Sequence, residues 1–156
     1  IEGRLLLRAP AGLFTLTAHA DRVDLLEDNT LKIIDYKTGK RPTNAAIRAG
    51  FSPQLPLEAA IISANGFTGI EAKPVSKMEF WTLSGGRSPG VVENIDDDIS
   101  DLAQQAYQGL VALVTRFDDP ATPYLSQPDR RWIKRFAEYD HLARVAEWAN
   151  SEENSE

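Results

Sequence analysis

Two short segments of the sequence carry the side chains best suited to chemistry. The first contains Asp21, and the second reads Asp35-Tyr36-Lys37. Alternate residues of a β-strand share a face, so Asp35 and Lys37 are expected on one side of a strand and Tyr36 on the other. A hairpin between the segments would bring Asp21 across to Asp35. The pattern therefore predicts two carboxylates and one ammonium in a common place.

Two carboxylates held close together need a proton or a cation between them. At a separation of about 4 Å they repel by roughly 4 kcal/mol at an effective dielectric near 20. Carboxylate, carbonyl and water oxygens suit Mg²⁺, which also contacts substrate phosphate. Such an ion can activate water and neutralise a phosphodiester under attack. Lys37 could orient or deprotonate the attacking water, or stabilise charge in the transition state.

Hydrophobic periodicity predicts the elements that must position these groups. Asp28 and Asn29 are turn residues between 14–26, which reads as one long strand or two, and a strand at 31–37. Residues 38–42 form a loop with Gly and Pro at its limits. Later patterns predict helices at 44–48, 54–64, 99–117 and 139–149, and a strand at 75–83.

These elements indicate an α/β domain over residues 1–149, followed by a disordered acidic tail over 150–156. The expected architecture is a mixed central sheet built around the hairpin of residues 14–37 and the strand at 75–83. The helices at 54–64 and 99–117 would flank this sheet. The active face would lie at the hairpin.

Three sequence motifs resemble a known nuclease family. Residues 20–24 (ADRVD) and 33–39 (IIDYKTG) resemble the second and third motifs of the PD-(D/E)XK nuclease superfamily in its RecB-like branch. Residues 52–58 (SPQLPLE) resemble the glutamine motif that follows in that branch. Residues 15–60 and 139–148 together are similar to the C-terminal nuclease domains of alphaproteobacterial AddB proteins, helicase-nuclease subunits in double-strand break repair.

The resemblance implies a restriction-endonuclease-like fold and Mg²⁺- or Mn²⁺-dependent exonuclease activity on DNA, alongside an AddA-like partner subunit. By position it makes Asp21 and Asp35 metal ligands, the backbone carbonyl of Tyr36 a further ligand, and Lys37 the catalytic lysine. Gln54 would stand beside the site on the following helix, touching DNA or positioning the lysine.

The sequence departs from the family pattern in three respects. Glu58, one helical turn after Gln54, stands where many relatives have tyrosine, which leaves its role open. The upstream helix with an additional Glu or His does not precede the first strand, so the isolated segment need not be active. The iron-sulfur cluster of many AddB-like domains needs cysteine, and the chain has none.

Composition limits the remaining classes. No apolar run is long enough to cross a bilayer and no secretory leader is visible, so we expect a cytoplasmic bacterial protein without membrane contact. The net charge of −6 argues weakly against a broad nucleic-acid-binding surface. Basic residues nevertheless gather locally at Lys37, Lys40, Arg41 and Arg48. Residues 1–4 (IEGR) also read as a protease-recognition scar, and their origin stays open.

Several structural readings compete with the functional ones. Taken alone, an aspartate and a lysine two residues apart more often form a solvated ion pair than a catalytic pair. The order of Asp21, a hairpin, Asp35 with Lys37, a Gly-bearing loop and a glutamine-bearing helix favours the catalytic interpretation. We interpret His19 as structural rather than as part of the site, and Asp24 as an ion-pair partner of a base such as Arg22. Two alternatives to a nuclease remain: a catalytically silent DNA-binding or subunit-interaction module, and a metal-dependent hydrolase of another substrate.

Overall fold

The computed structural model describes residues 1–86 and 90–124 of the 156-residue chain. Residues Ile1–Pro120 form one compact unit, and only 121–124 of the second unit, Ala121–Glu156, are described. The helix predicted at 139–149 and the tail at 150–156 lie outside the described residues. The domain boundary at residue 149 therefore stays a prediction.

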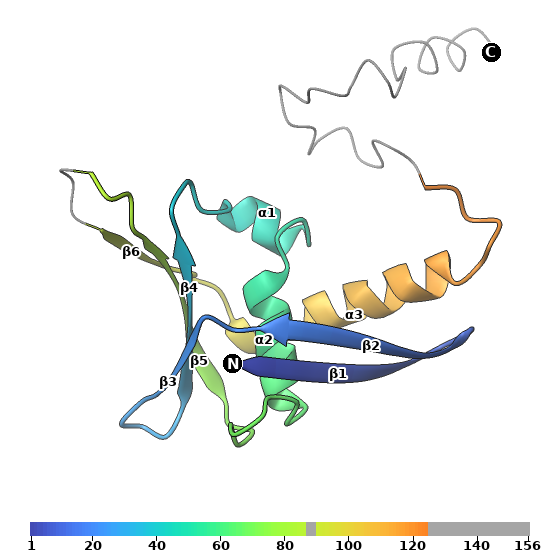
Figure 1. Ribbon diagram of the computed structural model, residues 1–156, viewed down its shortest axis with the longest axis horizontal. Helices are drawn as coiled ribbons and strands as arrows, with labels where there is room; N and C mark the ends of the chain where they lie inside the picture. Colours follow the sequence, from blue (N-terminus) through green and yellow to red (C-terminus); the bar gives the residue numbers. More distant parts are fainter. Residues whose placement is uncertain (87–89, 125–156) are drawn as a thin grey trace, which may run out of the picture. The chain divides into compact units, whose positions relative to one another are not determined.

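A four-stranded mixed sheet forms one layer of the fold (Figure 1). Its order is β3 (Arg22–Leu25), β4 (Leu31–Lys37), β5 (Val75–Thr82) and β6 (Val91–Asn94). Strand β4 pairs antiparallel with β3 and parallel with β5, and β6 pairs antiparallel with β5. The α/β fold class, with a mixed sheet flanked by helices, is confirmed.

The predicted hairpin connects β3 to β4. Asn29 adopts a φ of 64°, and the Asp28 carboxylate accepts hydrogen bonds from the backbone N–H and the hydroxyl of Thr30. Short polar side chains favour such a turn because they bond to the backbone of the next residues. In the β4 interior, Ile33 and Ile34 are fully buried, one on each face of the strand. Strand β4 is thereby fixed in the core.

Three helices follow the order predicted from the sequence. Thr43 caps the short helix α1 (Asn44–Arg48) by accepting from Ala46 N, and Asp98 caps α3 (Ile99–Phe117) by accepting from Asp101 N. Helix α2 (Gln54–Ser63) ends one residue before the predicted limit. Within the described part of the chain, no helix has the length and apolar character needed to cross a membrane.

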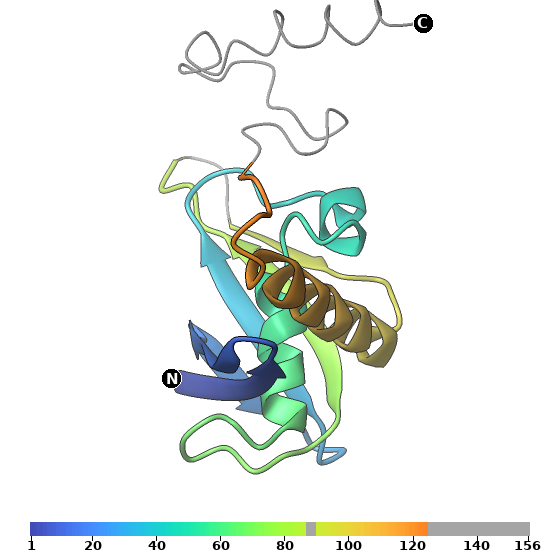
Figure 2. The ribbon, with the colours of Figure 1, turned by 90° about the vertical axis from the view of Figure 1, so that its right-hand side faces the viewer.

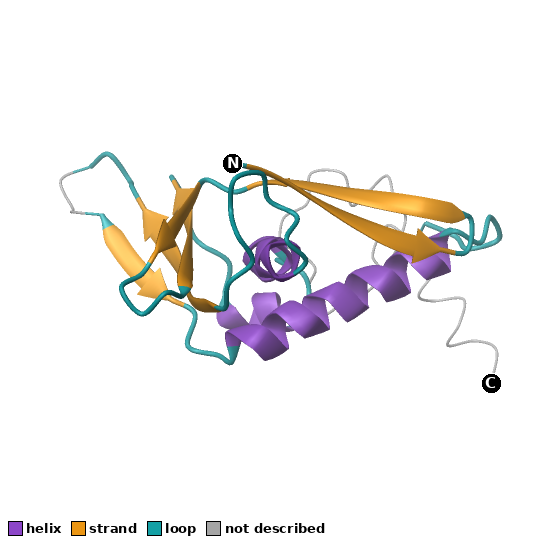
Figure 3. Ribbon diagram, turned by 90° about the horizontal axis from the view of Figure 1, so that it is seen from below, coloured by secondary structure: helices purple, strands orange, loops and turns teal. Residues whose placement is uncertain are grey.

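Helix α2 occupies the centre of the fold, because it is buried around most of its circumference. Seen end-on in Figure 3, it lies with the four-stranded sheet to one side, α3 to another and a long hairpin to a third. Figure 2 shows α3 crossing in front of it. The predicted buried positions Leu55, Ala59 and Ile62 are each 1% exposed. A helix apolar on so many sides is stable only inside a core.

The segment before β3 does not join the central sheet, and this part of the prediction was wrong. Residues Glu2–Ala9 (β1) and Gly12–His19 (β2) form a separate two-stranded sheet. Ile1 and Ala20 close its end through two backbone hydrogen bonds of 2.8 and 2.9 Å. The hairpin packs Leu5 and Leu7 into the core beside α2. The strands predicted within 14–26 from hydrophobic alternation are present, but alternation does not indicate which other strand each of them pairs with.

A matched pair of glycine substitutions tests the packing of α2 against β1. A Cβ at Gly66 would lie 2.1 Å from the Arg4 carbonyl oxygen, whereas a Cβ at Gly109 on α3 meets nothing within 4 Å. We expect Gly66→Ala to lower the free energy of unfolding by about 1–3 kcal/mol through overpacking. Gly109→Ala should raise it by about 0.5–1 kcal/mol. Urea denaturation measures both, and equal effects of the two variants would contradict this packing.

Candidate active site

Asp35 and Lys37 lie near the carboxyl end of β4 and share one face, as strand alternation predicts. Asp35 is 2% exposed. Its Oδ2 lies 2.7 Å from Lys37 Nζ, and the contact has poor hydrogen-bond geometry, so the attraction is mainly between opposite charges. A buried carboxylate without a cationic partner would be strongly destabilising. Lys37 therefore stabilises the burial of Asp35.

Asp21 stands immediately before β3, next to the part of β4 that carries Asp35. The register pairs Arg22 with Ile34, so Asp21 is one step further toward Asp35. Its Oδ2 accepts a 2.9 Å hydrogen bond from the backbone N–H of Tyr36. The sequence did not reveal this bond, which attaches an exposed carboxylate to the backbone between Asp35 and Lys37.

Helix α2 brings an amide and a third carboxylate to the same place. Lys37 Nζ donates to Gln54 Oε1 at 3.3 Å, and Gln54 Nε2 donates to Glu58 Oε1 at 3.3 Å. A chain of contacts thus runs from Asp35 through Lys37 and Gln54 to Glu58. The predicted proximity of Gln54 to the lysine is observed.

Glu58 is a buried acid with an unusual protonation equilibrium. Its side chain is 2% exposed, and burial raises the pKa of Glu58 from its ordinary 4.5 to about 7. The charges of Asp35 and Asp21 also raise the pKa, while the Gln54 hydrogen bond and Lys37 lower it. Both aspartates therefore act electrostatically on one buried group.

The opposite face of the sheet carries a separate cluster. Trp81 meets Tyr36 edge-on at 5.8 Å between ring centroids, and Arg22 lies over the Trp81 ring at 5.5 Å. Arg22 Nε donates to Asp24 Oδ1 at 2.7 Å, which confirms the predicted ion pair. His19 is exposed on β2, where it pairs in register with Glu2 in the other sheet. No hydrogen bond or ion pair described here joins His19 to Asp21.

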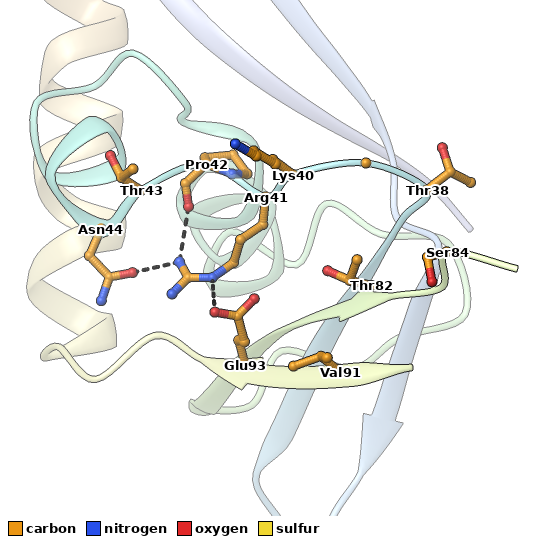
Figure 4. Close-up of a pocket in the computed structure, with 11 residues that line it drawn as sticks. Thr38, Lys40, Arg41, Pro42, Thr43, Asn44, Thr82, Ser84, Val91 and Glu93 are labelled. Atoms are coloured by element: carbon orange, nitrogen blue, oxygen red, sulfur yellow. Dashed lines mark hydrogen bonds and ion pairs between the residues drawn. The ribbon is translucent and has the colours of Figure 1, made fainter. Parts of the chain in front are cut away.

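A cavity of about 720 Å³ begins directly after Lys37. The 38–44 loop forms one wall, and residues of β5 and β6 with Ser84 form the other (Figure 4). Arg41 crosses between the walls: its Nε lies 2.9 Å from Glu93 Oε1, and its Nη1 donates to Asn44 Oδ1 at 2.8 Å. Sequence reasoning missed this connection because β6 was not predicted.

Ion pairs neutralise much of the basic cluster predicted from the sequence. Arg41 pairs with Glu93, Arg48 pairs with Asp97 at 2.8 Å, and Lys37 pairs with Asp35. Lys40 is exposed and has no ion-pair partner among the described residues. The positive face is therefore much smaller than the count of basic residues suggests.

The oxygen donors present suit a hard cation, although they do not form a complete cage. The described residues contain no group of three or more His, Cys, Asp or Glu side chains spaced to hold a metal ion. Asp21, Asp35 and the Tyr36 carbonyl offer oxygen atoms of the kind that Mg²⁺ prefers. Since Mg²⁺ usually keeps several waters and is bound by one or two carboxylates, the donor set fits that ion.

The mixed sheet flanked by helices defines a domain of the restriction-endonuclease-like fold. Residues 2–132 match the family model of the PD-(D/E)XK nuclease superfamily, and the chain belongs to that superfamily. Most of the described structure lies within this match.

Relatives of the chain occur in Rickettsia. An uncharacterized protein of Rickettsia bellii is 40% identical over 67 residues, covering 43% of the chain and 8% of the relative. One of Rickettsia typhi is 37% identical over 84 residues, covering 54% of the chain and 9% of the relative. The matched segments thus cover less than a tenth of these relatives' length. No solved structure matches it significantly.

The protonation of Glu58 should make folding stability depend on pH in the metal-free protein. Unfolded glutamate titrates near 4.5 and folded Glu58 near 7, so the folded state retains a proton that the unfolded state loses in this range. The contribution to the free energy of unfolding therefore falls as pH rises from 4.5 to 7. Glu58→Gln should stabilise the protein by about 1–3 kcal/mol at pH 8 and little at pH 4.5.

Denaturant titrations of both proteins in EDTA at several pH values measure this difference. The other titrating groups are the same in the variant and the wild type, so their contributions to the free energy of unfolding cancel in the comparison. A difference in stability that is the same at pH 5 and pH 8 would contradict the assignment.

Proposed function

We propose that the chain is the catalytic core of a metal-dependent nuclease that hydrolyses DNA phosphodiesters. The observation that carries the proposal is the contact chain Asp35–Lys37–Gln54, with Asp21 bonded to the backbone beside it. A solvated surface ion pair requires neither a buried carboxylate nor an amide from a separate helix. Membership of a nuclease superfamily supports this reading.

Asp21 and Asp35 would hold Mg²⁺ or Mn²⁺, with the backbone carbonyl of Tyr36 as a further ligand. When bound, such an ion supplies Lewis-acid stabilisation of the phosphate and lowers the pKa of a coordinated water. The Asp21 carboxylate is already oriented by the N–H of Tyr36, which reduces the freedom it must lose on binding.

Lys37 would act as the catalytic lysine. Its ammonium is held between Asp35 Oδ2 and Gln54 Oε1, and its side chain is 28% exposed, so it can still meet a substrate. From this position it could orient the attacking water, or donate to a phosphate oxygen as negative charge develops. Gln54 would position the lysine, because its amide oxygen faces Nζ.

The DNA backbone would lie along the cavity that begins directly after Lys37. Thr38, Lys40 and Thr43 bring hydroxyl groups and a positive charge to its rim, and such groups contact phosphates without reading sequence. With Arg41 and Arg48 in ion pairs, we expect few direct phosphate contacts and a modest dependence of DNA affinity on salt.

At a finer level, we propose that the chain serves an AddAB-type helicase-nuclease as an exonuclease domain that processes double-strand breaks with an AddA-like subunit in the bacterial cytoplasm. The motif resemblance of residues 15–60 to AddB proteins supports this assignment. The length of the Rickettsia relatives fits a nuclease domain within a much larger protein.

A second candidate is a catalytically silent module that binds DNA or a partner subunit. One observation favours it: the described residues contain no group of three metal-ligating side chains. In that case the Asp35–Lys37 pair would be purely structural.

The nuclease proposal predicts the effect of removing the lysine. In the complete protein, Lys37→Ala and Asp35→Ala should each reduce Mg²⁺- or Mn²⁺-dependent DNA cleavage by about 100-fold or more, because transition-state stabilisation is lost. Lys77→Ala provides a matched control, since Lys77 is an exposed lysine on β5 in register with Lys32. Gel assays with labelled DNA measure the rates. Cleavage at the wild-type rate by both site variants, with DNA binding retained, would favour the silent module.

The exonuclease assignment predicts a dependence on DNA ends. Linear duplex DNA should be degraded by the complete protein with its helicase partner and ATP, and covalently closed circles of the same sequence should survive. Circles have no end at which degradation can begin. Equal cleavage of both substrates would overturn the exonuclease assignment and leave an endonuclease.

A further inference from the structure

Glu58 carries an oxygen atom that the rest of the site does not use. Its side chain is 2% exposed on α2, and its Oε1 accepts from Gln54 Nε2. The other oxygen, Oε2, is buried and has no hydrogen-bond partner among the described residues. Buried carboxylate oxygens normally have partners, because leaving one unsatisfied costs about 1–3 kcal/mol or more. An ion or an ordered water is the usual partner of such an oxygen.

The charges around Glu58 show which kind of ligand would fit. Asp35 and Asp21 are close enough for their negative charges to raise the pKa of Glu58, whereas Lys37 has a smaller opposing effect. Lys37 Nζ is already shared by Asp35 Oδ2 and Gln54 Oε1, so it reaches Glu58 only through the Gln54 amide. Two aspartates thus act on Glu58, and the one ammonium nearby is already shared, so excess negative charge remains around Glu58 that a cation would offset.

We propose that Glu58 is a third carboxylate of the cation site and that its Oε2 reaches the ion through a coordinated water. A bridging water fits the absence of a direct three-side-chain cluster in the described residues. It also fits Mg²⁺, which gives up its waters reluctantly. Glu58 thereby supplies an acidic group from α2. This inference rests on the proposed metal-dependent function.

Metal affinity tests the inference without relying on catalysis. Isothermal titration calorimetry with Mn²⁺ at pH 8 should show one or more sites in the complete wild-type protein. Glu58→Gln should weaken this binding by about 10–100-fold, the usual cost of losing a group that supports metal ligands through hydrogen bonds. The variant keeps an acceptor for Gln54 and is expected to be more stable without metal, so weaker binding would not reflect unfolding.

Two further variants make the outcome decisive. Glu79→Gln changes another buried glutamate, which pairs with Lys32 and accepts from Trp81 Nε1 on the opposite face, and it should leave Mn²⁺ affinity unchanged. Asp21→Asn retains an acceptor for Tyr36 N but should abolish binding if Asp21 is a ligand. Wild-type affinity in Glu58→Gln together with loss in Asp21→Asn would overturn the role of Glu58 and leave the nuclease proposal standing. Absence of Mn²⁺ binding by the wild type would overturn both.

Discussion

The burial of Asp35 on the central strand is the constraint on which the site depends. A carboxylate that is 2% exposed, directly after the core positions Ile33 and Ile34 of the strand, is tolerated only with a cation beside it. The cation is the ammonium of Lys37, two residues further along β4, which lies on the same face of the strand as Asp35. The nearby backbone is fixed as well, since Tyr36 N donates to Asp21. Burial of one acid thus determines where the ammonium and the second acid must lie.

Helix α2 meets a second constraint, because it must serve the core and the site together. Leu55 and Ala59 each pack into the core. One position earlier in each turn, Gln54 contacts Lys37 and Glu58 contacts Gln54. A helix held by packing on several sides cannot rotate, so its polar residues are positioned by apolar neighbours. The resulting order of Asp35, Lys37, Gln54 and Glu58 comes from core packing and does not require a flexible loop.

Local physics explains what the sequence alone could predict. Strand parity placed Asp35 with Lys37, the Asp28-Asn29 turn set the β3–β4 hairpin, and Gln54 was correctly expected beside the lysine. Partner choice between distant strands could not be predicted, so β1–β2 pairing and the Arg41–Glu93 contact were missed. The burial of Glu58 was missed for a related reason: helical periodicity gave its face, but only the tertiary packing around α2 shows that this face is closed.

The distribution of charge indicates how such a site would meet an anionic substrate. The chain carries a net charge of −6, and ion pairs occupy Lys37, Arg41 and Arg48 near the candidate site. A broad positive field that would attract DNA from a distance is therefore absent from the described surface around the site. In the proposed nuclease, Asp21 and Asp35 would repel a phosphodiester without a divalent ion, so the cation would be needed for approach as well as for chemistry. An acidic site of this kind couples substrate binding to metal binding, and a third carboxylate at Glu58 would strengthen that coupling because it increases the charge that only a cation can offset.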